Sequence, residues 1–142
     1  MLRIMSRLLV PVLVCALAAC TTASGPPMTA AQRLYQAHGN YNIALGVAVT
    51  YAESSVAKPA IVHRLRQAND VAAPAFRYAE AFLACAGAAN SQDPAIMIAN
   101  ARCQGLDLSP AAIQRNSGVL TNAASQIYGL LRSAVTRGIF GG

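Results

Sequence analysis

Residues 59–82 read PAIVHRLRQANDVAAPAFRYAEAF, and their apolar positions recur at alternating steps of three and four residues. This spacing keeps one face of an α-helix apolar. Pro59 suits the first turn of such a helix, whereas Pro74 removes an interior backbone hydrogen bond and favours a kink. The predicted apolar face consists of Ile61, Leu65, Ala68, Ala72, Ala75, Ala79 and Phe82.

A second helical pattern precedes this stretch. It begins at Thr29, where Thr29-Ala30-Ala31-Gln32 fits a capping box. His38-Gly39-Asn40 has the composition of a helix stop, but the apolar phase is the same on both sides of it. We therefore predict one continuous helix, the alternative being a break at Gly39 that would give a fourfold bundle. Its apolar face is Ala31, Leu34, His38, Tyr41, Leu45, Ala48 and Ala52.

The third pattern begins at Ser109-Pro110, a capping residue followed by a first-turn proline, and stops at Gly138. Before it, Asp93-Pro94 caps a short helix that runs to about Ala101. Strand signals are nearly absent. The sequence thus predicts an all-α fold, an antiparallel up-down-up three-helix bundle with a short extra helix in the second connection. The apolar face of the third helix is Ile113, Ser117, Leu120, Ala124, Ile127, Leu131 and Ala134.

The N-terminus has the layout of a cleavable export signal. Arg3 and Arg7 flank the start of an apolar run over residues 8–17, which leads into Leu17-Ala18-Ala19-Cys20. The run is too short for a transmembrane helix, which needs about 20 apolar residues. The last four residues resemble the lipobox of bacterial lipoproteins. This resemblance implies a diacylglyceryl group on the Cys20 sulfur, cleavage before Cys20 and acylation of the new N-terminus.

Plain secretion and a retained anchor remain the alternatives to lipidation. With lipidation, the chain divides into a signal peptide (1–19), the lipidated cysteine and a tether (20–28), a helical bundle domain (29–138) and a tail (139–142). In lipoproteins of two-membrane bacteria, an Asp after the cysteine retains the protein at the inner membrane. Thr21 stands there in this chain. The resemblance therefore implies a cell-envelope location at the periplasmic face of the outer membrane, given such a host.

Cysteine usage agrees with export. Cys15 leaves with the signal and Cys20 takes the lipid, so Cys85 and Cys103 remain as one pair in an oxidising compartment. We predict a disulfide between them, which would add roughly 3 kcal/mol of stability in the chain-entropy model. Two free thiols are the alternative. The helical body itself resembles small alanine-rich lipoproteins of proteobacteria, some encoded in prophage regions, that have no assigned activity.

The charge of the mature chain is mildly positive, with nine basic and five acidic residues from Cys20 onward. It favours contact with anionic lipid headgroups or acidic wall polymers, and nucleic acid is a poor partner outside the cytoplasm. The densest basic spot is His63, Arg64 and Arg66, whose side chains point apart on a helix. Three tyrosines lie beside the apolar faces, where they either serve an interface or flank the core: Tyr35, Tyr51 and Tyr128.

Motifs for catalysis or metal binding are not found in the sequence. There is no paired-carboxylate arrangement, Gly-rich phosphate loop, nucleophile elbow or paired-histidine motif. We predict no catalytic residue, no metal site and no cofactor beyond the covalent lipid on Cys20. His38 is the notable polar residue in the first apolar face. We interpret it as a partly buried side chain bonded to Ser117 or Asn116.

A haem or metal ligand is the alternative role for His38, with His63, Met28 or Met97 as the second ligand. For the whole chain, the expectation is a membrane-anchored, non-enzymatic structural or protein-interaction module of the cell envelope. Its partners would be the membrane, an envelope protein, an anionic surface or a second copy. The alternatives are a small-ligand carrier, with space near Pro74 and the alanine-rich faces, and a modulator of an envelope enzyme.

Overall fold

The computed structural model describes residues 27–139, with side chains described as far as residue 136. The predicted signal peptide, Cys20 and nearly all of the tether lie outside these residues. The described part is 81% helical and contains no strand, which confirms the all-α class. Its elements are α2 (Ala30–Glu53), α3 (Pro59–Ala89), α4 (Pro94–Met97), the 3₁₀ turn η2 (Ala101–Cys103) and α5 (Pro110–Ile139).

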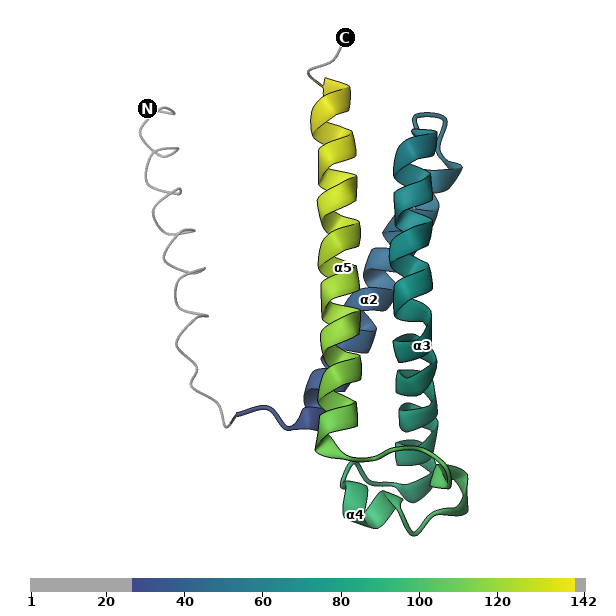
Figure 1. The fold of residues 1–142 in the computed structure, drawn as a ribbon, viewed down its shortest axis with the longest axis vertical. Coiled ribbons are helices and arrows are strands. Elements are labelled where there is room, and N and C mark those ends of the chain that lie inside the picture. Colours follow the sequence, from purple (N-terminus) through teal and green to yellow (C-terminus); the bar gives the residue numbers. More distant parts are fainter. Residues whose placement is uncertain (1–26, 140–142) are drawn as a thin grey trace, which may run out of the picture.

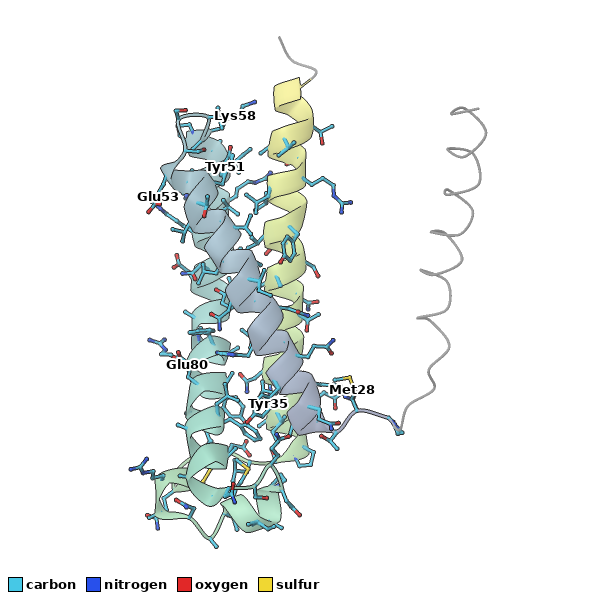
Figure 2. The ribbon with its side chains drawn as sticks, turned by 180° about the vertical axis from the view of Figure 1, so that it is seen from behind. Met28, Tyr35, Tyr51, Glu53, Lys58 and Glu80 are labelled. Carbon is cyan, nitrogen blue, oxygen red and sulfur yellow. A yellow bond between two sulfur atoms is a disulfide. The ribbon has the colours of Figure 1, made fainter. Side chains whose placement is uncertain are left out.

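Three long helices lie side by side, and α4 sits at one end of the molecule (Figure 1). Residue 27 enters at the end where α4 lies, and the connection 54–58 lies at the opposite end (Figure 1). In Figure 2, Met28 and Tyr35 mark the first end and Glu53 and Lys58 the second. Helix α2 packs mainly on α5, as does α3, whereas α2 and α3 meet over a shorter stretch.

The predicted helix starts are confirmed. The Gln32 backbone N–H donates to Thr29 Oγ1 (3.1 Å), and the Thr29 N–H donates to Gln32 Oε1 (2.8 Å), completing the capping box. Pro59 occupies the first turn of α3. At the start of α5, Ser109 Oγ accepts from the Ala112 N–H at 3.2 Å. Side-chain caps therefore mark the starts of α2 and α5, and a first-turn proline marks the start of α3.

Helix α2 runs through Gly39 without interruption, as predicted, and α3 continues through Pro74. The short helix is briefer than expected, because α4 ends at Met97 rather than near Ala101. Asn100 ends it by capping the next turn: its Oδ1 accepts from the Arg102 N–H at 3.0 Å. Its Nδ2 donates to the Ala88 carbonyl at 3.1 Å, which ties the turn to the end of α3.

The core confirms every predicted apolar-face position of α3 and α5, including Ser117 as a buried polar residue. For α2 the prediction is partly wrong. Ala37 and Ala44 are buried, whereas His38 and Leu45 are half-buried and Ala52 is exposed. The other four predicted positions are buried: Ala31, Leu34, Tyr41 and Ala48. Because α2 rests mainly on α5, its buried face is turned slightly, toward Ala37 and Ala44, relative to the face inferred from the pattern alone.

The second connection is fastened to α3. Cys85 and Cys103 are joined as the predicted disulfide, with Cα atoms 5.1 Å apart, and both are buried. The Tyr78 hydroxyl donates to the Asp107 carbonyl at 2.6 Å, a further link between α3 and this connection. No helix within residues 27–139 combines the length and apolar character needed to cross a bilayer.

Candidate functional site

A groove of about 450 Å³ lies between the C-terminal half of α2 and the N-terminal half of α3. We call it the α2–α3 groove. Its lining is mostly apolar, and its size falls within the range of small-ligand pockets. Small side chains on α2 leave this space where the two helices face each other. Its lining includes Leu45, Ala48, Val49, Leu65, Arg66, Asn69 and Asp70.

One end of the groove is polar, and a buried tyrosine of the core holds one of its polar side chains in place. Tyr41, which is 1% exposed, donates its hydroxyl to Asn69 Oδ1 at 2.8 Å. Burial raises the pKa of Tyr41, and the negative charge of Asp70 raises it further, so the hydroxyl stays a donor. With its oxygen engaged, Asn69 can offer amide N–H groups to a ligand. Arg66 and Asp70 add charges of opposite sign to the lining.

An aromatic cluster lies next to this polar end. The His38 ring stacks on Phe76 of α3, with ring centroids 4.9 Å apart and an interplanar angle of 15°. Phe76 also contacts Tyr41 in a tilted arrangement at 5.6 Å. His38 Nε2 lies 3.5 Å from Asn42 Nδ2 on the same helix. The cluster holds α2 and α3 in register just beyond the groove.

The predicted hydrogen bond from His38 to Ser117 or Asn116 is wrong. Ser117 Oγ donates to the Gln114 carbonyl at 3.1 Å, and Asn116 Nδ2 donates to the Ala112 carbonyl at 2.8 Å. Both side chains thus bond within α5. The rotation of α2 explains the error, because it brings His38 against Phe76 of α3 rather than against α5.

The alternative role of His38 as a haem or metal ligand requires a second ligand close to its ring. Phe76 and Asn42 are its contacts, rather than the second ligands named for it, His63, Met28 or Met97. Met97 belongs to the second connection and is fully buried. Across the part of the chain that the structure describes, no three His, Cys, Asp or Glu side chains gather in a way that could hold a metal ion.

Other candidate residues fall into separate places. Cys20 lies outside the described residues. Tyr51 flanks the core, and its hydroxyl accepts from the Lys58 N–H at 3.0 Å, which fastens the connection between α2 and α3. Tyr35 and Tyr128 are exposed. The structure therefore brings none of the candidate tyrosines into the α2–α3 groove.

Sequence reasoning missed Asn69 and the groove. Asn69 follows the buried Ala68 and therefore stands at the edge of the apolar face of α3. The sequence signal for this pair was a polar residue at the edge of one apolar face and a tyrosine in the apolar face of the neighbouring helix. The pairing depends on the register between α2 and α3, which a single sequence does not contain.

Comparison of the chain with protein families, with curated proteins and with solved structures finds no match. The function is therefore inferred from the residues of the chain itself.

Proposed function

We propose that this chain is a lipid-anchored, non-enzymatic interaction module of a bacterial cell envelope, tethered through Cys20 to the periplasmic face of the outer membrane. The observation that carries the location is the lipobox-like Leu17-Ala18-Ala19-Cys20 after a basic and apolar leader. The pairing of Cys85 with Cys103 supports it, because disulfides persist in oxidising compartments.

The helix order is part of this proposal. In it, α2, α3 and α5 form an antiparallel up-down-up bundle. The short connection 54–58 supports this order, since helices joined by a few residues pack as antiparallel neighbours. The Tyr41–Asn69 hydrogen bond supports it for α2 and α3.

The proposed mechanism is geometric. A lipid on Cys20 confines the bundle to one surface and raises its effective concentration toward partners there. The α2–α3 groove lies in the half of the bundle near the connection 54–58, away from the end that residue 27 enters (Figure 2). The apolar lining accepts an apolar side chain of a partner, and Asn69 and Asp70 bond the polar groups beside it.

The groove offers a matched pair of variants to test this role. Val49 lines it and is 48% exposed, whereas Val47 is 46% exposed on the same helix and does not line it. In intact cells, chemical crosslinking of the tagged protein followed by affinity capture is expected to recover a protein partner. Val49→Glu should abolish that capture and Val47→Glu should preserve it. Capture that is indifferent to Val49 would overturn the groove as the docking site.

The anchor is tested separately. Wild-type protein should fractionate with membranes and carry diacylglyceryl on Cys20 by mass spectrometry, and Cys20→Ala should lose both properties. A Cys20→Ala protein that remains correctly processed and membrane-bound would contradict lipidation.

A second candidate function, a small-ligand carrier, is favoured by the volume and apolar lining of the same groove. Native mass spectrometry of purified protein distinguishes it from the interaction module. A carrier should retain a bound small molecule that Val49→Glu releases and Val47→Glu does not. Capture of an envelope enzyme as the protein partner would instead favour a modulator of that enzyme.

A further inference from the structure

The end of the bundle that carries α4 displays apolar side chains to solvent. Ile96 is 55% exposed and Ile98 is 71% exposed, and between them Met97 is completely buried. Met97 therefore fixes the segment to the core, and its two neighbours project from it. Ile96 and Ile98 are two positions apart, so they emerge on either side of Met97 rather than from one face. We call this end of the bundle, with its two exposed isoleucines, the α4 tip.

The α4 tip is held rigidly. The Cys85–Cys103 disulfide joins the far side of the connection to α3, and the Asn100 side chain bonds the Ala88 carbonyl at 3.1 Å. At the start of α4, Asp93 Oδ1 accepts from the Ala95 N–H at 2.9 Å. A segment fastened at these points presents its exposed isoleucines without a further cost for ordering its backbone.

The chain enters the bundle at this same end. Met28 lines a surface hollow together with Gln92, which belongs to the connection that leads into α4. From Thr21 to Pro27, seven residues span at most about 25 Å when fully extended. By contrast, the 30 residues of α5 extend over about 45 Å at 1.5 Å per residue. A lipid on Cys20 therefore keeps the α4 end within reach of the bilayer, whereas the far end of an upright bundle is beyond it.

We propose that the α4 tip is a membrane-docking surface, with Ile96 and Ile98 inserted among the lipid headgroups and upper acyl chains. The inference rests on the proposed lipidation of Cys20. The covalent lipid supplies the affinity, and the two isoleucines set the orientation, so that the bundle stands on its α4 end. The α2–α3 groove then lies in the half of the bundle farther from the membrane.

The chain contains no tryptophan, so single-tryptophan variants report on each end without background. Ile98→Trp labels the α4 tip, and Val56→Trp labels the opposite end; both positions are 71% exposed in the structure. The full-length lipidated proteins are reconstituted into phosphatidylethanolamine–phosphatidylglycerol vesicles, with and without brominated acyl chains. Ile96→Trp is a second probe of the tip, and circular dichroism checks that each variant is folded.

The expected result is a blue shift and a strong loss of emission on bromination for Ile98→Trp and Ile96→Trp, with neither change for Val56→Trp. Quenching at both ends would mean that the bundle lies on its side, and it would overturn the inference. A blue shift that depends on protein concentration without bromine quenching would indicate a second copy on the tip and overturn it too. Lipidated protein with unquenched tip probes overturns this inference alone, whereas absence of lipid on Cys20 overturns the proposed function with it.

Discussion

The Tyr41 hydroxyl joins α2 to α3 inside the core, where its removal leaves the half-buried Asn69 oxygen without its donor. We expect Tyr41→Phe to lower the free energy of unfolding by about 1 kcal/mol, because a half-buried acceptor loses its hydrogen bond while the ring packing is kept. Urea denaturation followed by circular dichroism measures the effect. Tyr128→Phe is the matched control on an exposed tyrosine. Equal stability of Tyr41→Phe and wild type would contradict a structural role for the hydroxyl.

Asp107 gives the fold a predictable response to acid. Hydrogen bonds from the Ser109 backbone N–H and side chain lower the pKa of Asp107, and the positive charge of Arg115 lowers it further. The unfolded chain therefore binds this proton more readily than the folded chain. The contribution of Asp107 is complete above the ordinary aspartate pKa of about 4 and is lost as pH falls below it.

We expect Asp107→Asn, which keeps an oxygen acceptor but cannot titrate, to flatten the fall in stability between about pH 5 and pH 2. Unfolding midpoints measured across this range test it, with Glu53→Gln as the matched loss of one exposed carboxylate. A slope for Asp107→Asn that equals the wild-type slope would show that Asp107 contributes nothing to acid sensitivity.

Among the elements, the connection between α3 and α5 depends most on a covalent link. The Cys85–Cys103 disulfide spans 18 positions in sequence and bridges the end of α3 to η2. Reduction is expected to lower the free energy of unfolding by about 3 kcal/mol, chiefly through the freedom regained by the unfolded chain. Denaturation of the same protein with and without reductant measures it free of any cavity effect. The double variant Cys85→Ala/Cys103→Ala should not respond to reductant, and a wild type that is equally stable when reduced would contradict the prediction.

Helices α3 and α5 were predictable because each combines a start signal with an uninterrupted apolar phase, and both core faces follow the pattern at every position. The start signal is a first-turn proline in both, with the Ser109 cap added in α5. For helix α2, the sequence predicted the extent and four buried positions, but not which residues between them face the core. Either Ala37 and Ala44 or their neighbours His38 and Leu45 could face the core, and packing on α5 buries the alanines. The rotation of α2 also brings His38 against Phe76 and places Leu45 in the groove lining. The candidate site therefore depends on how two helices pack together, and no sequence motif within one helix reveals it.

At the scale of the whole molecule, the two ends of the bundle have different proposed roles: the α4 tip contacts the membrane, and the half near the connection 54–58 carries the groove. The short tether joins the lipid on Cys20 to the α4 end. The α4 tip meets the bilayer only while the lipid holds it close. Inserting fifteen Gly and Ser residues after Gly25 leaves the lipobox-like residues unchanged but lowers the effective concentration of the tip at the membrane by about fivefold, from the −3/2 power of tether length.

We expect the lengthened protein to fractionate with membranes as before, because the lipid on Cys20 is untouched. The bromolipid quenching of Ile98→Trp should decrease, since two isoleucines on one tip supply little affinity of their own. A lengthened protein in which quenching is unchanged would show that the α4 tip binds the bilayer autonomously. The tip would then hold the bundle upright without help from the short reach of the chain between Cys20 and Pro27.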